Sequence, residues 1–219
     1  MKIGILAVQG DFAAHAAMLK SLGVESVEVR TPEALDSCDA LILPGGESTT
    51  QLQFLQEEGL DKAIRKFVAS DKAVFGTCAG AILLAKEVKN PKQESLGLLD
   101  ITVLRNGYGR QVHSDVVSGP TTLKDEPLEM VFIRAPVIER TGQGVQVLAK
   151  YEGKPALVQS DNVIAAAFHP ELTVDTTVHE RFLKMVRERL PTRQEAKSTG
   201  AQNGGVKSNG AKAKRSSGR

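Results

Sequence analysis

The fold of this chain is set by the stretch Val74-Phe75-Gly76-Thr77-Cys78-Ala79-Gly80-Ala81. An apolar strand runs into a Gly-x-Cys-x-Gly turn, and a helix starts directly after it, which is typical of a nucleophile elbow with Cys78 in place of serine. The glycines permit a tight, strained turn, and the N-terminal end of the helix points toward the sulfur, so both effects favour a thiolate. A buried core cysteine between small residues is the alternative for this stretch alone.

Around the elbow, short apolar runs alternate with amphipathic segments. In the first half we expect strands at Lys2–Val8, Ser26–Val29, Ala40–Leu43 and Ala73–Phe75. We expect helices at Phe12–Leu22, directly after Thr31-Pro32 and over Ala79–Glu87, and a long helix that begins near Ser48 or Thr49, either of which could cap it, and is interrupted near Gly59. The second half is richer in strand, at Leu98–Leu104, Glu129–Ile133, Val145–Tyr151, Ala156–Gln159 and Val163–Phe168, before a closing helix over Val174–Leu190. This order predicts an α/β fold in which helices cover a mostly parallel sheet.

Composition narrows the class of protein. The 219 residues are 41% hydrophobic and 25% charged, which is typical of one soluble domain. From Pro191 onward there are seven Lys or Arg and one Glu, so the formal charge of +2 leaves −4 for residues 1–190. We therefore expect a folded domain over 1–190 and a basic, disordered tail over 191–219, and we do not expect nucleic acid as a partner of the domain.

Other features of the sequence exclude further classes. No run approaches the roughly 20 apolar residues that cross a bilayer, so no membrane segment is expected. Two cysteines, Cys38 and Cys78, form no paired zinc motif and make a poor disulfide framework. These observations favour a reducing, cytoplasmic location and no metal, and Cys38 is expected to be a small residue before a buried strand.

A cysteine nucleophile needs a base, and the histidines are His15, His113, His169 and His179. His169 follows a strand in the sequence Phe168-His169-Pro170-Glu171. We expect Pro170 to keep the backbone extended, which would place the side chains of His169 and Glu171 on one side, as in a catalytic triad. A purely structural turn is the alternative for this motif alone. We expect His15 to be a capped surface residue on its helix, with a place in a partner interface as the alternative. His179 is expected to lie on the outer part of the last helix.

A third signal is the segment Leu41–Thr50, where a strand runs into Gly45 and Gly46 and then into a helix. Backbone N–H groups exposed in such a turn could hold an oxyanion or a carboxylate. The segment contains no Gly-Lys-Ser/Thr, which argues against a phosphate loop. A plain strand-to-helix turn is the alternative.

Together these motifs resemble the class I glutamine amidotransferases, which are Cys-His-Glu glutaminases on a three-layer, flavodoxin-like fold. The chain is similar in particular to the glutaminase subunits of pyridoxal 5′-phosphate synthase. The matching segments, which span residues 1 to about 190, are Val8-Gln9-Gly10-Asp11 with His15, Pro44–Thr50, Gly76–Gly80, 105–111, Ile133-Arg134-Ala135-Pro136 and Phe168–Leu172.

The resemblance implies a role for each matched residue. Cys78 would attack the carboxamide of L-glutamine, His169 would shuttle protons and Glu171 would orient His169. A glutamyl thioester would form, ammonia would leave, and water would release glutamate. The backbone N–H groups of Gly46 and Ala79 would form the oxyanion hole. The glutamine site would be lined by Gly46, Glu47, Ser48, Arg105, Ile133 and Arg134, with no cofactor.

The resemblance also implies a partner. Ammonia would pass to a synthase subunit that forms a double ring of barrels and builds pyridoxal phosphate from a pentose phosphate and a triose phosphate. Docking would activate a weak glutaminase and rearrange the loop at Gly45-Gly46, with Gln9 and Gly10 near the interface. Gly107 and the basic tail depart from the family pattern. The tail is expected to be a solvated extension without a function, and a weak contact with RNA or an acidic partner is the alternative.

Two other functions remain open on the sequence. A cysteine hydrolase of the same fold, acting on peptides or γ-glutamyl substrates, would share the elbow. A silent subunit that only docks and stabilises a partner would have no chemical need for Cys78, His169 and Glu171 together.

Overall fold

Seven strands form the central sheet of the computed structural model, which describes residues 1–105, 107 and 115–190. Its spatial order is β10-β11-β12-β4-β3-β1-β2. The strands are β1 (Lys2–Leu6), β2 (Glu25–Val29), β3 (Ala40–Leu43), β4 (Ala73–Thr77), β10 (Gln146–Tyr151), β11 (Lys154–Ser160) and β12 (Val163–Ala166). The neighbouring pairs from β12 to β2 are all parallel, and β11 and β10 extend that edge in antiparallel fashion. The mostly parallel sheet and its 2-1-3-4 order agree with the predicted flavodoxin-like class.

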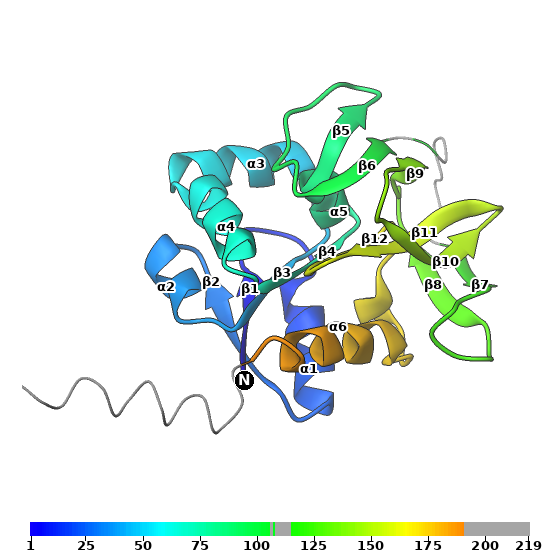
Figure 1. Cartoon of the computed structure of the whole chain (residues 1–219), viewed down its shortest axis with the longest axis horizontal. Helices are drawn as coiled ribbons and strands as arrows, with labels where there is room; N and C mark the ends of the chain where they lie inside the picture. Colours follow the sequence, from blue (N-terminus) through cyan, green and yellow to red (C-terminus); the bar gives the residue numbers. More distant parts are fainter. Residues whose placement is uncertain (106, 108–114, 191–219) are drawn as a thin grey trace, which may run out of the picture. The chain divides into compact units, whose positions relative to one another are not determined.

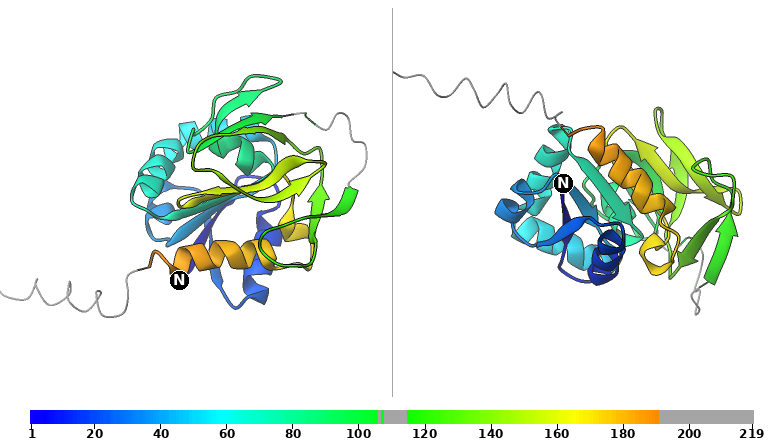
Figure 2. Two further views of the ribbon diagram at one scale, coloured as in Figure 1. Left: turned by 45° about the vertical axis from the view of Figure 1, so that its right-hand side comes forward. Right: turned by 90° about the horizontal axis from the view of Figure 1, so that it is seen from below.

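Helices cover both faces of this sheet (Figure 1). One face carries α1 (Phe12–Ser21) and α6 (Thr177–Arg187), which lie in front of the sheet in the right-hand view of Figure 2. The other face carries α2 (Pro32–Asp36), α3 (Ser48–Glu57), α4 (Leu60–Ala69) and α5 (Ala79–Leu84). Every residue of β3, β4 and β12 is buried between these layers, which explains why those strands are almost continuously apolar. The three-layer prediction is confirmed.

Two smaller sheets lie outside the central one. The first joins β5 (Ala85–Lys89), β6 (Leu99–Leu104) and β9 (Val137–Thr141). The second pairs β7 (Asp115–Gly119) with β8 (Leu128–Phe132). These strands confirm the expected strand-rich second half, although β5, β7 and β9 were not predicted.

The predicted helix over Ala79–Glu87 is wrong in its second part. The helix ends at Leu84, and the next five residues form β5, which pairs in parallel with β6. Ala85, Lys86 and Glu87 are good helix formers, so local propensity favoured a longer helix. Pairing with a strand that is remote in sequence outweighs that propensity here.

Other boundaries moved less. The long helix from Ser48 is interrupted as predicted, because Gly59 adopts a left-handed conformation with φ 71° and separates α3 from α4. The closing helix is shorter than Val174–Leu190.

Met1–Arg189 forms one compact unit. The prediction of a disordered tail over 191–219 lies outside the described residues. None of the described helices combines the length and the apolar character that crossing a membrane requires.

Candidate active site

Cys78 stands at a sharp turn between β4 and α5. Its backbone has φ 48° and ψ −101°, a strained conformation for a residue with a side chain. At this turn the backbone of Gly80 packs closely against both Leu43 and Gly76. A Cβ on Gly80 would collide with the carbonyl oxygen of Leu43, and one on Gly76 would lie 2.6 Å from the carbonyl carbon of Gly80. The glycines are thus required by close packing, and the predicted elbow is present.

His169 and Glu171 meet directly after the end of β12. His169 Nδ1 lies 2.8 Å from Glu171 Oε1, and both side chains are buried. The expected extended backbone is wrong, because Pro170–Leu172 forms a 3₁₀ turn, η1, closed by the Leu172 N–H donating to the His169 carbonyl. Proline suits the first position of such a turn. The bond to Glu171 occupies Nδ1 and leaves Nε2 of His169 for Cys78.

The electrostatics of His169 favour an imidazolium. Burial lowers its pKa, but hydrogen bonds to Cys78 and Glu171 and the charges of both partners outweigh burial and raise the pKa to about 10. Burial raises the pKa of Glu171, and the hydrogen bond from His169 opposes that rise. His169 therefore lies between the Cys78 sulfur and the Glu171 carboxylate and can carry a proton there.

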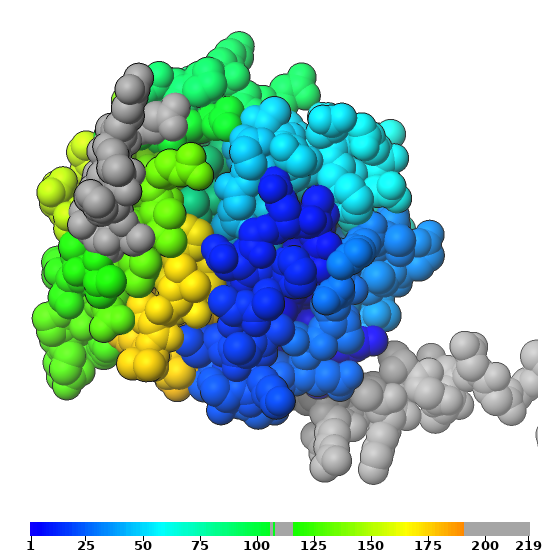
Figure 3. Space-filling view, turned by 180° about the vertical axis from the view of Figure 1, so that it is seen from behind, coloured from blue at the N-terminus to red at the C-terminus, as the bar shows by residue number. Residues whose placement is uncertain are grey.

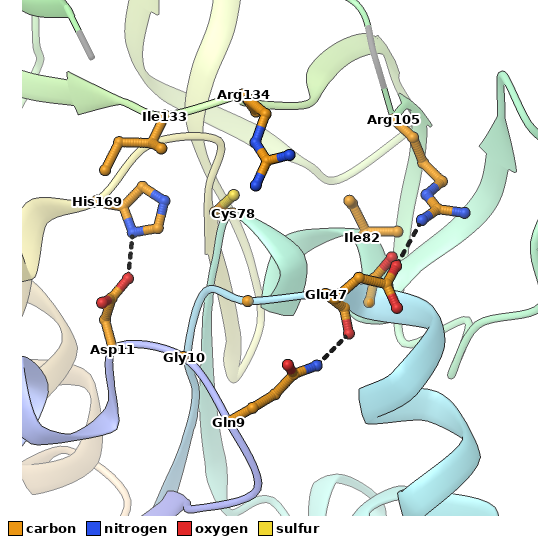
Figure 4. Close-up of a pocket in the computed structure, with 12 residues that line it drawn as sticks. Gln9, Gly10, Asp11, Glu47, Cys78, Ile82, Arg105, Ile133, Arg134 and His169 are labelled. Carbon is orange, nitrogen blue, oxygen red and sulfur yellow. Dashed lines mark hydrogen bonds and ion pairs between the residues drawn. The ribbon is translucent and has the colours of Figure 1, made fainter. Parts of the chain in front are cut away.

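Cys78 and His169 line a cavity of about 440 Å³ (Figure 4). In Figure 4, Cys78 lies at the centre, with His169 on one side and Ile82 and Arg105 on the other. The predicted glutamine-site residues Gly46, Glu47, Ser48, Arg105, Ile133 and Arg134 all line this cavity. Of the remaining candidates, Glu171 lies behind His169, and Ala79 is the first residue of α5.

Glu47 rather than Ser48 or Thr49 caps α3. Its carboxylate accepts from the backbone N–H groups of Thr49 at 3.1 Å and Thr50 at 2.8 Å, whereas Ser48 donates to Gln93. Burial raises the pKa of Glu47, but these hydrogen bonds outweigh it and lower the pKa to about 2. The same carboxylate forms an ion pair with Arg105 at 2.9 Å. One charged group thus anchors both a helix and an arginine at the cavity edge.

Ile133 and Arg134 approach the cavity from the segment after β8. Arg134 has φ 45°, a left-handed conformation that is unusual for a residue with a side chain. Ile133 is 36% exposed, which is high for a residue of its size. In Figure 4 the Arg134 guanidinium points toward Cys78. Of the 105–111 motif, residues 106 and 108–111 lie outside the described residues.

Several lining residues were not predicted as part of the site. Gln9, Gly10, Asp11 and Ile82 also line the cavity, although Gln9 and Gly10 were expected only near a partner interface. Gln9 donates to the Glu47 carbonyl at 2.9 Å, and Asp11 Oδ2 lies 3.4 Å from His169 Nδ1. Their position directly after β1, beside the carboxyl end of β3, is the signal that could have placed them here.

The expectations for His15 and His179 are wrong. Both are completely buried, and His15 Nδ1 lies 3.0 Å from His179 Nε2 where α1 meets α6. Each is followed three and four residues later by buried apolar side chains, Met18 and Leu19 after His15 and Phe182 and Leu183 after His179. That helical spacing was the overlooked signal. Cys38 stands before a buried strand, β3, as predicted, and is itself buried.

Asp11, His169 and Glu171 also offer one ligand atom each within 4.8 Å of one another. The His169 nitrogen in this group already bonds Glu171 at 2.8 Å. Within the described residues, this cluster is therefore accounted for as part of the hydrogen-bonded site.

This arrangement suits acyl transfer through a covalent intermediate. A thiol on a strained turn, an imidazole with raised pKa and a carboxylate behind it form a nucleophile, a proton carrier and an orienting group. The arginines at the cavity edge suit a ligand that carries a carboxylate.

Comparison with known proteins identifies the family. The model of the SNO glutamine amidotransferase family matches residues 5–188. The chain belongs to this family. A subunit named pyridoxal 5′-phosphate synthase subunit PdxT, from Koribacter versatilis, is 56% identical over 85% of this chain and 96% of that protein. The PdxT subunit of Thermotoga maritima is 52% identical over 85% of this chain and 100% of its own length.

One solved structure supports this assignment, and a second shares the fold. A crystal structure of a glutamine amidotransferase aligns with a TM-score of 0.79 and 47% identity over 84% of this chain and 98% of that one. PurLQS from Thermotoga maritima aligns with a TM-score of 0.63 and 19% identity over 84% and 97%. This second likeness concerns the fold alone.

Proposed function

We propose that this protein is the glutaminase subunit of a pyridoxal 5′-phosphate synthase, hydrolysing L-glutamine to L-glutamate and ammonia. The main support is the cavity that holds Cys78 beside the His169–Glu171 pair in a chain of this amidotransferase family. Relatives at 56% and 52% identity over nearly their whole length carry the synthase-subunit name.

In the first half-reaction, the Cys78 thiolate attacks the carboxamide carbon of glutamine. The oxygen becomes an oxyanion, for which we propose the backbone N–H groups of Gly46 and Ala79 as donors. Ala79 is the first residue of α5, so its N–H has no acceptor within that helix. The imidazolium of His169 then donates its Nε2 proton to the amide nitrogen, and the C–N bond breaks. Ammonia departs, and a glutamyl thioester remains on Cys78.

In the second half-reaction, neutral His169 removes a proton from water, and the resulting hydroxide attacks the thioester. The C–S bond breaks, glutamate leaves, and the thiolate–imidazolium pair is restored. Glu171 holds His169 in one tautomer throughout, because its carboxylate accepts from Nδ1. The raised pKa of His169 supports this role, since the imidazolium must be available when the amide nitrogen departs.

Substrate recognition falls to the cavity edge. Arg134, whose guanidinium points toward Cys78 in Figure 4, and Arg105 are the cationic groups we propose for the glutamine α-carboxylate. Glu47 is suited to the α-ammonium, because its low pKa keeps it ionised. Ser48 and Ile133 complete the proposed contacts.

The partner is proposed to be the synthase subunit that consumes the ammonia. A double-ring assembly of that subunit, activation of the glutaminase on docking and contact through Gln9 and Gly10 are the finer parts of this proposal. A cytoplasmic location, a domain over 1–190 and a separate tail over 191–219 stay predictions of the sequence.

The direct test is ammonia and glutamate release from glutamine by the full chain, alone and mixed with the synthase subunit. We expect stimulation by the partner, loss of all activity in Cys78→Ala, and normal activity in the matched control Cys38→Ala. Activity that ignores the partner would keep the glutaminase but contradict the pathway. Hydrolysis of γ-glutamyl peptides in preference to glutamine would favour the alternative hydrolase, and failure of both reactions with the partner present would favour a silent subunit.

A further inference from the structure

Behind the triad lies a pair of histidines that the mechanism above does not use. His15 on α1 and His179 on α6 are separated by 164 positions and joined by a 3.0 Å contact. Both are 0% exposed. Figure 3 shows the α1 region, dark blue, beside the yellow segment around η1, and α1 contacts η1 directly.

The pair reaches the triad through His15. His15 Nε2 lies 3.1 Å from the hydroxyl of Thr77, the residue before the nucleophile, and 3.4 Å from Glu171 Oε2. Glu171 Oε2 is buried and has no hydrogen-bond partner within the described residues, so His15 Nε2 at 3.4 Å is a close polar contact rather than a hydrogen bond, while Oε1 bonds His169. The Glu171 carboxylate therefore lies between two imidazoles, with His169 at one oxygen and His15 at the other.

The contacts select one set of tautomers. A carboxylate oxygen only accepts hydrogen bonds and repels a lone pair, so the proton of His15 belongs on Nε2, which lies 3.1 Å from the Thr77 hydroxyl and 3.4 Å from Glu171 Oε2. His15 Nδ1 is then an acceptor, and the Nε2–H of His179 donates to it. The remaining atom, His179 Nδ1, is buried and has no partner within the described part of the chain, which is tolerable for an acceptor. The opposite set would leave a buried donor there and turn a lone pair toward Glu171.

The surroundings keep both rings neutral. Burial, followed by the charges of His179 and His169, lowers the pKa of His15 well below its ordinary value, and burial lowers that of His179 to about 4. The Phe75 ring packs edge-on against both imidazoles, with centroids 6.0 Å and 5.6 Å away. Protonation of either ring would place a charge in an apolar layer.

We propose that His15, held by His179, is a positioning residue that fixes Glu171 in place and keeps it ionised behind His169. A buried carboxylate tends toward its neutral form, and a neutral N–H dipole 3.4 Å from Oε2 opposes this without adding a competing charge. The proposal rests on the function proposed above, because glutamine hydrolysis is one of its readouts.

The first test compares His15→Leu, which removes the donor, with His15→Gln, whose amide N–H can occupy the place of Nε2–H. We expect His15→Leu to lower kcat for glutamine about 3- to 10-fold, the range for losing one ordinary polar contact, with KM little changed. The acid limb of the kcat profile should move to higher pH, because Glu171 becomes harder to ionise. His15→Gln should recover most of kcat and of the profile.

The groups that face Glu171 and share this pH response are His169, Asp11 and His15 itself, with His179 behind them. Met18→Ala on the same helix is the matched control, since it removes a buried side chain without touching the network. It should lower the melting temperature and leave the pH profile unmoved. Equal losses of kcat in His15→Leu and Met18→Ala, with unshifted profiles, would overturn the proposal.

A second measurement does not depend on glutamine. In a Cys38→Ala background Cys78 is the sole cysteine, so its alkylation by iodoacetamide against pH reports the thiol–imidazole pair. We expect His15→Leu to shift that profile and His15→Gln to restore it. If the wild type failed to hydrolyse glutamine but showed this pattern, the proposed function would fail while the positioning role stood.

Imidazole ¹⁵N NMR of the wild type decides the matter even if His15→Leu does not fold. Neutral His15 with its proton on Nε2 supports the proposal. A proton on Nδ1, or a charged His15 at pH 7, contradicts it.

Discussion

On one side of the cavity Cys78, His169 and Glu171 are at most 7% exposed, and we call them the nucleophile side. On the other, the arginine side, Glu47 and Arg134 are exposed, Ile133 is 36% exposed and Arg105 is intermediate. Groups that change protonation need low dielectric and fixed partners, because those conditions set their pKa. Groups that only hold a charged ligand remain open to solvent until the ligand arrives.

Replacing the proton carrier should give the largest effect. His169→Gln keeps a polar side chain of similar reach but cannot carry a proton, so we expect kcat to fall about 10³- to 10⁴-fold with KM nearly unchanged. Steady-state glutamine hydrolysis with the synthase subunit measures both constants, and a thermal melt checks that the variant is folded. A rise in KM with unchanged kcat would contradict the distinction between the two sides.

The state of the pair on the nucleophile side can be followed by titration. The His169 imidazole should lose its proton near pH 10 in the wild type. In Cys78→Ala the pKa should fall, because the hydrogen bond and charge that oppose burial are gone. NMR titration of the ring makes the comparison, and identical midpoints near 6.5 in both proteins would contradict the account.

The raised pKa of His169 also makes the free energy of unfolding depend on pH. The folded state holds the His169 proton more tightly than the unfolded chain, whose histidines titrate near 6.5. The contribution of this proton to the free energy of unfolding is therefore complete below about pH 6.5 and is lost as pH rises to about 10.

Substitutions on the arginine side should weaken glutamine binding rather than slow turnover. Arg134→Ala removes a charge-assisted contact with the ligand carboxylate, and we expect KM to rise about 10- to 100-fold with kcat within about threefold of wild type. Arg140→Ala is the matched control, since Arg140 pairs with Asp100 on an outer sheet. A fall in kcat with unchanged KM would move Arg134 to the nucleophile side.

The smallest effect concerns Glu47 as a helix cap. Glu47→Ala should lower the free energy of unfolding by about 1 kcal/mol through loss of the α3 cap. Because the folded-state pKa is depressed to about 2, this contribution is present above about pH 4.5 and lost as pH falls toward 2. Denaturant unfolding at two pH values, with exposed Glu25→Ala as control, measures it. A pH-independent difference would argue against the carboxylate as the cap.

How far the sequence predicts this site depends on how local each signal is. The elbow was predictable because glycines, apolar strand and helix lie within eight residues, Val74–Ala81. The signals for the Gly45-Gly46 turn and the His169–Glu171 pair also lie within a few residues. The pair was predicted correctly even though the backbone conformation predicted at Pro170 was wrong.

The rest depends on packing between remote segments. His15 and His179 face each other only because α1 and α6 share one face of the sheet, which no pattern within either helix states. The β5 strand forms against β6 in place of a helix end. Glu47 became the cap because its longer side chain folds back while Ser48 turns to Gln93, 45 positions away.

The central claim is that Cys78 is the nucleophile toward glutamine. The most direct measurement is labelling of the full chain, with the synthase subunit present, by a glutamine-analogue electrophile such as a diazoketone, followed by peptide mass spectrometry. The account predicts one adduct, on Cys78, that excess glutamine suppresses and that is absent in Cys78→Ala. An adduct on Cys38, or none on Cys78 while glutamine is being hydrolysed, would contradict it.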